Sequence, residues 1–355
     1  MIIGVAGTAK NTGKTTTLCA LIQTAYANGH LPGVTGIGYD GEERDNVTLL
    51  PKPRIAVFPG MIVTTSEQCL AASTAKLRVL YRTGILTALG EVVVTVIEEG
   101  GLVVVAGPNK TADLAKVARH MVSLGVSELL VDGSLNRIAP MAVSDRVVFA
   151  TGGARSTNLA LLTEETSAIE QIFQHGVSEA DYTSVSGIRL VAKDVQIQCA
   201  SSAFHGTEDI VRIMDRIPEG LTEIILPGIV TADALSVLCD RLENVDAKSV
   251  TVVFDNPFRL LLAGEPARVG SLLRWLGALS VRIRYRHRSD LAAITFNPYY
   301  PAFDGTTYRP AYLDASSGRS TLSAALTTPV IDVMADGGEE LYKRCFDAAE
   351  TLASP

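Results

Sequence analysis

The amino-acid sequence predicts an α/β protein with a doubly wound, mainly parallel sheet and a second α/β domain. Three observations indicate this fold class. The chain opens with a short apolar run, residues 2–7, that enters a glycine- and threonine-rich loop followed by a helical pattern. Apolar strands then alternate with helical segments through the first half. The second half has its own alternation of strands and helices, which is typical of parallel sheets covered by helices.

The loop after the first strand has the composition of a phosphate-binding loop. It reads Gly7-Thr8-Ala9-Lys10-Asn11-Thr12-Gly13-Lys14-Thr15-Thr16, and we expect these ten residues to surround the phosphates of a nucleotide. Backbone N–H groups at a helix N-terminus favour negative charge, and a side chain at Gly13 would crowd their approach. Lys14 would place its charge on the β- and γ-phosphates, and the hydroxyl of Thr15 would bind Mg²⁺. The usual first glycine of such loops, five residues before Gly13, is Thr8 here, so the loop is a variant.

Composition narrows the class of protein. The chain has 355 residues, of which 47% are hydrophobic and 19% charged, as expected of a folded α/β protein with two domains. No apolar run is long enough to cross a bilayer, and the first strand starts at Met1, so we expect a cytoplasmic protein without membrane attachment. The net charge of −7 argues against nucleic acid as a partner. The five scattered cysteines indicate buried thiols rather than disulfides or metal ligands.

The segments after the loop continue the alternation. Residues 15–28 have a helical pattern that Gly29 would end, and residues 33–38 form a second short strand. The polar segment that follows contains Asp40 and Glu42. We expect Asp40 to orient water or Mg²⁺ near the γ-phosphate, with Glu42 as the alternative; a solvated acidic turn is an equally good interpretation.

Six further elements are expected before the next candidate site. Residues 54–65 read as strand, turn and strand, and Ser66 would cap a helix over 66–80. Val-rich strands at 91–97 and 102–106 are close enough to form a hairpin or to lie side by side. A helix over 111–124 follows.

The strand before Asp132 carries the second candidate site. Residues 128–131 are apolar except for Glu128, and an acid at the end of such a strand would reach the same sheet edge as the glycine loop. We therefore expect Asp132 to be a Mg²⁺ ligand together with Thr15. Gly133 would let the backbone run close to the phosphates, and Arg137 is a weaker candidate for a phosphate contact, with Asn136 beside it.

A strand at 145–150 and a helix at 158–173 complete the first half. The intervening segment, residues 150–155, is the candidate loop on the base side of the nucleotide. The organisation changes near residues 176–180. We place the domain boundary there, with a nucleotide-binding domain at 1–178 and an output, substrate or dimerisation domain at 179–355.

The second half contains strands that end in polar residues. We expect strands at 222–226, 249–254, 279–285, 291–296 and 329–333, and helices at 231–242, 266–276 and 339–352. Asp255-Asn256 and Asn297-Pro298 follow two of the strands, so their ends are expected to line one cleft. The basic segment 282–288 reads as a solvated or partner-contacting edge, and His205 as a surface or capping residue rather than a catalytic base.

The glycine loop resembles that of P-loop NTPases of the dethiobiotin synthetase and cobyrinate amidase branch, relatives of the MinD and nitrogenase iron protein group, together the SIMIBI class. The second lysine that the latter group carries five residues before the loop lysine corresponds to Ala9, so that role is not transferred to Lys10. The loop taken with Leu226-Pro227-Gly228 and Thr295-Phe296-Asn297-Pro298 also resembles, more weakly, a P-loop family found beside cobalamin-dependent lysine or ornithine aminomutases and described as reactivase subunits. A homodimer is expected only by analogy.

Three functions follow from these observations. The first is a Mg²⁺-dependent ATPase that couples hydrolysis to a conformational change in a protein partner, such as reactivation of a cobalamin-dependent aminomutase. Lys14 and Asp40 would be its catalytic residues. The second is an ATP-dependent ligase or kinase acting on a small carboxylate, like dethiobiotin synthetase, with Lys10, Lys110 and Arg137 binding the substrate. The third, a scaffold without activity, is disfavoured by the intact Gly13-Lys14-Thr15. ATP is preferred to GTP because the chain lacks an Asn-Lys-x-Asp motif.

Overall fold

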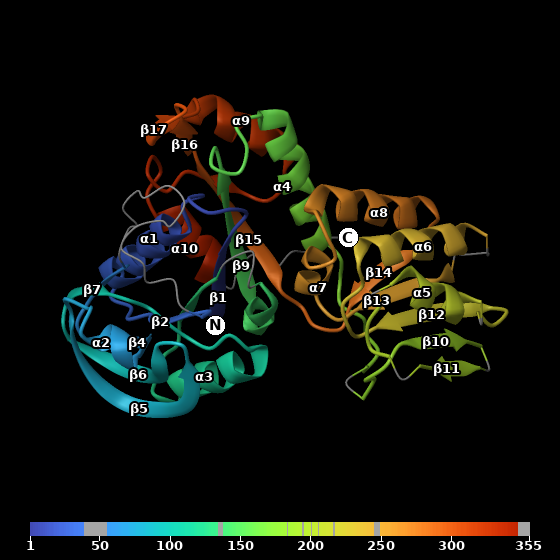
Figure 1. Ribbon diagram of the computed structural model, residues 1–355, viewed down its shortest axis with the longest axis horizontal. Helices are drawn as coiled ribbons and strands as arrows, with labels where there is room; N and C mark the ends of the chain where they lie inside the picture. Colours follow the sequence, from blue (N-terminus) through green and yellow to red (C-terminus); the bar gives the residue numbers. More distant parts are fainter. Residues whose placement is uncertain are drawn as a thin grey trace. The chain divides into compact units, whose positions relative to one another are not determined.

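The chain forms two units in the computed structural model (Figure 1). The structure describes residues 1–38, 55–133, 138–182, 184–193, 195–199, 201–204, 206–215, 217–244 and 249–346. The first unit comprises Met1–Thr163 and Leu291–Pro355, and the second comprises Glu164–Asp290. Among the described residues, no helix is both long enough and apolar enough to cross a membrane.

The first unit is built on a mainly parallel sheet, which confirms the mixed α/β class. Its nine described strands follow the order β18-β15-β9-β1-β8-β2-β4-β6-β5. Their bounds are β1 (Ile2–Gly7), β2 (Gly33–Gly36), β4 (Ile62–Ser66), β5 (Lys76–Thr87), β6 (Gly90–Glu99), β8 (Leu129–Asp132), β9 (Arg146–Gly152), β15 (Asp290–Asn297) and β18 (Val330–Ile331). The strands from β9 to β4 pair in parallel, whereas β6 pairs antiparallel with both β4 and β5.

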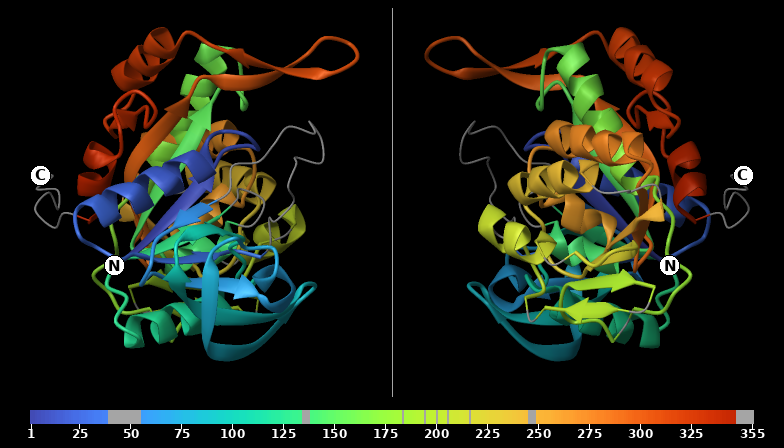
Figure 2. Two further views of the ribbon diagram at one scale, coloured as in Figure 1. Left: turned by 90° about the vertical axis from the view of Figure 1, so that its left-hand side faces the viewer. Right: turned by 90° about the vertical axis from the view of Figure 1, so that its right-hand side faces the viewer.

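The remaining elements of the first unit surround this sheet. Its helical segments are α1 (Lys14–Ala27), α2 (Glu67–Leu70), α3 (Thr111–Ser123), η2 (Ala139–Val143), α9 (Ala315–Ala325) and α10 (Glu339–Phe346), and α4 (Leu159–Phe173) begins in it. Two small antiparallel pairs join β3 (Ile55–Val57) to β7 (Gly101–Val103) and β16 (Tyr299–Phe303) to β17 (Tyr308–Tyr312). Figure 2 shows β16 and β17 as a hairpin that extends away from the body of this unit.

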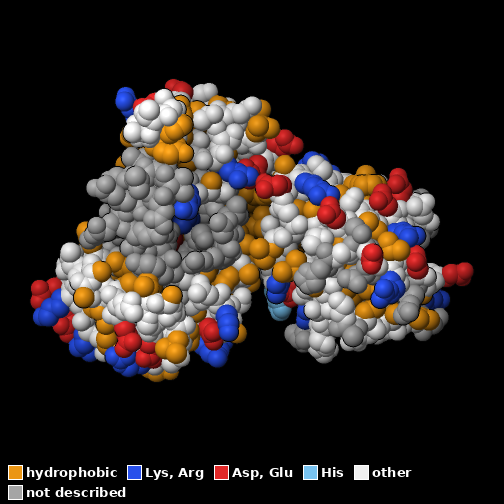
Figure 3. Space-filling model, in the orientation of Figure 1, with side chains coloured by type: hydrophobic (Ala, Val, Ile, Leu, Met, Phe, Trp, Pro, Cys, Tyr) orange, Lys and Arg blue, Asp and Glu red, His pale blue; other side chains and the backbone are white. Residues whose placement is uncertain are grey.

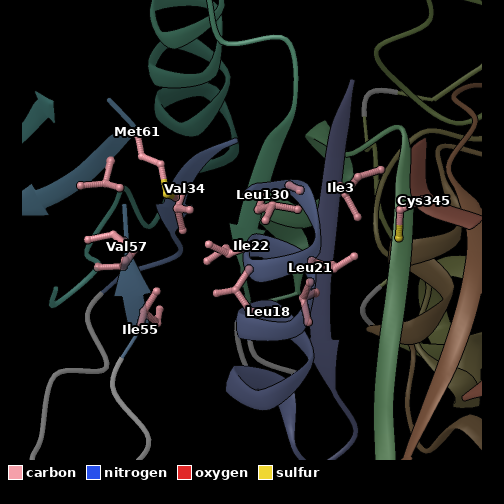
Figure 4. Packing of buried hydrophobic residues seen from close by; sticks show 14 of the residues in the cluster. Ile3, Leu18, Leu21, Ile22, Val34, Ile55, Val57, Met61, Leu130 and Cys345 are labelled. Carbon is pink, nitrogen blue, oxygen red and sulfur yellow. The ribbon is translucent and has the colours of Figure 1, made fainter. Parts of the chain in front are cut away.

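The core of the first unit explains why α1 lies on the sheet. Leu18, Leu21 and Ile22 repeat at helical spacing and are fully buried, so one face of α1 is apolar. They pack against Ile3 of β1 and Leu130 of β8 in one hydrophobic cluster (Figure 4). Burial of such side chains contributes roughly 1.5–3 kcal/mol each. This packing determines where α1 begins relative to the ends of β1 and β8.

Two expectations for residues 66–106 were wrong. Only Glu67–Leu70 is helical in the stretch expected as a helix, and β5 starts at Lys76. The expected neighbours at 91–97 and 102–106 do not pair with each other, because β6 pairs with β4 and β5 while β7 pairs with β3. The pairing of β5 with the adjacent β6, and of β7 with the more distant β3, overrides the local pattern in each case.

The second unit contains a smaller mixed sheet. Its described strands follow the order β11-β10-β12-β13-β14, with bounds β10 (Arg189–Ala192), β11 (Gln196–Gln198), β12 (Leu221–Leu226), β13 (Thr251–Phe254) and β14 (Arg282–Tyr285). β12, β13 and β14 are parallel, and β10 is antiparallel to β12. The helices are α5 (Thr207–Met214), α6 (Ala232–Glu243), the unexpected α7 (Pro257–Leu261) and α8 (Pro266–Ala278). Acidic and basic side chains are interspersed over the face of this unit that Figure 3 presents.

The division into units differs from the expected boundary between residues 178 and 179. Residues 291–355 belong with the N-terminal part of the chain, because β15 joins the large sheet beside β9. The C-terminal helix α10 also packs on α1, and the hydroxyl of Tyr342 donates a hydrogen bond of 2.7 Å to Glu128. A pairing between such distant strands leaves no periodic signal in the sequence.

Candidate functional site

The glycine loop leaves the C-terminal end of β1, a strand that lies between β8 and β9. Asn11 has φ of 63° and Gly13 has φ of 94°, both in the left-handed region. Gly13 is the N-cap residue of α1, and it has no side chain that could accept a hydrogen bond from the N–H groups of the first turn. The first backbone N–H groups of α1, those of Lys14 and Thr15 among them, therefore lack an acceptor within the helix.

Neighbouring side chains pack directly against the two glycines of the loop. A methyl group at Gly7 would lie 2.6 Å from Cγ of Lys14 and 2.6 Å from Oγ1 of Thr12. The aliphatic part of Lys14 thus lies back over Gly7. At Gly13, a methyl group would lie 3.2 Å from Cβ of Asn297. Both positions require a residue as small as glycine for the loop to keep this form.

Hydrogen bonds hold the loop in place. The hydroxyl of Thr12, which is 1% exposed, donates to the carbonyl oxygen of Ala9 at 3.0 Å. Thr8 donates from its backbone N–H to the carbonyl of Ala150 at 2.9 Å, and from its hydroxyl to that of Thr151 at 2.9 Å. Lys10 lies exposed on the loop, whereas Thr15 and Thr16 are half-buried in the first turn of α1. The ten predicted residues therefore run from the end of β1 through the loop into the first turn of α1.

The charges at the start of α1 favour an anion. The first turn has no acidic side chain and contains Lys14. A cation near the positive end of the helix dipole is unfavourable by itself, typically by 0.3–1 kcal/mol. An anion bound between these N–H groups and Lys14 would make the electrostatic energy at this end of the helix favourable.

Asp132 lies on the strand next to the loop, as expected. It pairs with Val5 of β1 in register, and the N–H of the following Gly133 donates to the carbonyl of Val5 at 2.9 Å. Burial chiefly, and secondarily the charge of Asp132, raises the pKa of the Cys19 thiol. Cys19 follows Thr15 by one turn of α1.

Gly133 packs against a methionine, and its expected approach to the phosphates stays a prediction. A side chain there would meet Sδ of Met141 at 2.6 Å. Glycine is thus required by packing against η2.

The expected base-side segment, residues 150–155, packs against the glycine loop and against β15. Gly152 has φ of 147°, and a methyl group there would lie 1.8 Å from the carbonyl oxygen of Asn297. The N–H of Gly153 donates to that same oxygen at 3.0 Å. This segment therefore borders the glycine loop; its contact with a base stays a prediction.

Asn297 is a residue of this site that the sequence did not identify. Its Nδ2 donates to the carbonyl oxygen of Asn11 at 3.2 Å, and its Oδ1 accepts from the N–H of Tyr299 at 3.2 Å. Asn297 belongs to the first unit and Asp255 to the second, so the expected cleft that both would line stays a prediction. Its place after a buried strand was the available signal, but that strand, expected at 291–296, was assigned to the second half of the chain.

Thr295, two residues earlier on β15, makes a second link to the same helix. Its hydroxyl and that of Thr17 are 2.8 Å apart, and both side chains are buried. β15 is therefore attached to α1 immediately behind the glycine loop.

Several predicted residues lie outside the described part of the chain. These are Asp40 and Glu42, Asn136 and Arg137, and His205. Lys110 is described and precedes α3 as its N-cap residue. Among the described residues, no group of three or more His, Cys, Asp or Glu side chains is placed to hold a metal ion. The binding of Mg²⁺ by Thr15 and Asp132 stays a prediction.

No family model, no curated protein and no solved structure matches this chain.

Proposed function

We propose that this protein is a P-loop ATPase that depends on Mg²⁺ and couples ATP hydrolysis to a conformational change in a partner. The observation that carries the proposal is the junction of β1 and α1. There a left-handed Gly13 leaves the first N–H groups of the helix unpaired, and Lys14 lies back over Gly7. Unpaired donors with an adjacent lysine, at the C-terminal edge of a parallel sheet, suit the phosphates of a nucleotide.

The residues present fit a nucleotide with its metal. Gly7 lets the side chains of Lys14 and Thr12 lie against the loop backbone, and Gly13 lets that of Asn297 do so, which would keep the loop in the tight form that phosphate binding needs. Thr15 offers a hydroxyl and Asp132 a carboxylate from the neighbouring strand, an all-oxygen set that suits Mg²⁺. Bound Mg²⁺ would supply charge neutralisation during phosphoryl transfer.

Each residue would then have a separate task. The backbone from Gly7 to Gly13 would orient the phosphates, and Lys14 would stabilise negative charge as the γ-phosphoryl group departs. Thr15 and Asp132 would hold the metal, and Asp40 is proposed to orient the attacking water. Asn297 would keep the carbonyl of Asn11 turned away from the phosphates by donating to it.

The test is release of inorganic phosphate from ATP and GTP with Mg²⁺, by the wild type and by Lys14→Ala. We expect slow turnover that prefers ATP and falls at least 100-fold in Lys14→Ala, because the lysine acts in the transition state. Lys116→Ala, which removes an exposed lysine of α3, is the matched control and should not change turnover. Equal rates for Lys14→Ala and the wild type would refute the proposal.

A panel of small carboxylates separates the two enzyme classes. Turnover that none of them changes supports an ATPase that acts on a protein partner. Turnover that appears only with one carboxylate, together with a phosphorylated or ligated product, would replace the ATPase with a kinase or ligase.

A further inference from the structure

A second cluster of charged side chains lies at the C-terminal edge of the sheet in the second unit. Asp255 follows β13, and Arg286 and His287 follow β14. The N–H of Arg286 donates to the carbonyl of Phe254, and that of His287 to the carbonyl of Asp255, both at 2.9 Å. These bonds extend the parallel pairing beyond the strand ends, so the side chains are held by the sheet at the edge where open α/β sheets bind ligands.

One carboxylate in this cluster is shared among several cationic and donor groups. Oδ1 of Asp255 lies 3.3 Å from Nη1 of Arg286 and 3.9 Å from Nε2 of His287. Oδ2 lies 3.6 Å from Nε of Arg259 and accepts a hydrogen bond of 2.8 Å from Asn256. The two arginines alone exceed the charge of Asp255, so the cluster carries a net positive charge.

Arg286 is the buried member of the cluster. Its side chain is only 10% exposed, and its Nη2 donates to the carbonyl oxygen of Tyr182 at 2.7 Å. Its Nε–H is buried, and the described residues offer it no acceptor. A buried guanidinium is normally fully hydrogen-bonded, since desolvating it without full pairing is unfavourable.

The opposite side of the cluster is open. The side chains of Arg259 and His287 are 36% and 57% exposed. Two arginines and a histidine around one carboxylate provide planar donors that a second oxyanion can share, and guanidinium groups match carboxylate and phosphate oxygens well. We propose that Arg259, Arg286 and His287, grouped around Asp255, form a binding site for a small oxyanion, a phosphate or carboxylate group. All four residues belong to the second unit, so this site does not depend on the proposed ATPase function.

The test follows the imidazole NMR signals of His287 in the full-length protein during titration with inorganic phosphate and, separately, with succinate. Sodium chloride at matched ionic strength measures the effect of screening alone. The signals are assigned by their loss in His287→Gln. The titrations are repeated in Lys14→Ala, so that phosphate at the glycine loop does not contribute. We expect a saturable shift with one of the two anions, and the anion that saturates at lower concentration identifies the preferred group.

Arg259→Ala is the decisive variant, because its side chain is partly exposed and its removal should leave the fold intact. We expect it to weaken anion binding about tenfold or more, as loss of a charge-assisted hydrogen bond does. Arg268→Ala removes an exposed arginine of α8 paired with Asp233, and it should bind the anion as the wild type does. A shift that does not saturate with either anion, or that is equally strong in Arg259→Ala, would overturn the proposal. Neither result depends on ATP turnover.

Discussion

The side-chain amide of Asn297 donates a hydrogen bond of 3.2 Å to the carbonyl oxygen of Asn11, although the two residues are 286 positions apart. The backbone oxygen of Asn297 accepts from Gly153, so one residue connects the glycine loop, β15 and the segment after β9. The hairpin β16–β17 starts two residues later, at Tyr299. A change in the loop on phosphate binding would therefore reach β15 and this hairpin directly.

Replacing Asn297 by alanine should weaken ATP binding without unfolding the protein. The carbonyl of Asn11 loses its donor and becomes free to turn toward the phosphates. A net loss of about 1 kcal/mol corresponds to about fivefold weaker binding, measurable by titration calorimetry. Asn244→Ala removes a comparable amide bond to the carbonyl of Asp240 in α6 and should bind ATP normally. If the two variants bind alike, Asn297 has no role in the loop.

Gly13→Ala and Gly29→Ala should separate backbone strain from loop function. Both glycines have positive φ, 94° and 79°, so alanine is strained at either by roughly 1–2 kcal/mol. A methyl group at Gly29 meets no atom within 4 Å, whereas one at Gly13 approaches Asn297. We expect a similar loss of stability in thermal unfolding, with loss of ATP binding in Gly13→Ala alone. Normal ATP binding by Gly13→Ala would contradict the role assigned to the loop.

The buried hydroxyl pair Thr17 and Thr295 should stabilise the attachment of β15 to α1. Thr17→Val leaves the Thr295 hydroxyl buried without its partner, which should lower the free energy of unfolding by about 1–3 kcal/mol. The double variant Thr17→Val/Thr295→Val should recover part of this loss, because neither hydroxyl then remains unpaired. Denaturant unfolding followed by circular dichroism provides the double-mutant cycle. Additive losses would show that the two hydroxyls are not coupled.

The second unit should lose stability in acid because of His175. Burial, and then the charge of Arg284, lowers the pKa of this imidazole to about 4 from the usual value of 6.5. Below pH 6.5 the unfolded chain binds a proton that the folded chain does not, so stability falls as the pH drops toward 4. For a pKa shift of this size, the free energy of unfolding falls by about 3 kcal/mol in total.

The only tryptophan, Trp275, lies in α8 of the second unit and reports its unfolding by fluorescence. In His175→Gln, the part of the fall in unfolding free energy between pH 6.5 and pH 4 that comes from His175 should disappear. A variant with the same pH profile as the wild type would exclude His175 as its source.

Local patterns determined much of the first unit from sequence alone. The β1 strand, the glycine loop and α1 are contiguous, so the apolar run, Gly13 and the helical spacing of Leu18, Leu21 and Ile22 were sufficient to predict them. Asp132 was equally predictable, since an acid that ends a buried strand of a parallel sheet must reach the edge where the glycine loop lies.

Tertiary structure alone decided which distant segments complete the site and where the units divide. β15 reads as one more apolar strand, and nothing in its sequence specifies whether β9 or β14 is its neighbour. β5 is a different case: its first residues, 76–80, were expected in a helix, and pairing with β6 at the sheet edge makes them a strand. Strand pairing joins residues without regard to their separation in the chain, so a periodic pattern identifies a strand but not its partner. Asn297 enters the site for that reason: β15 carries it to Asn11.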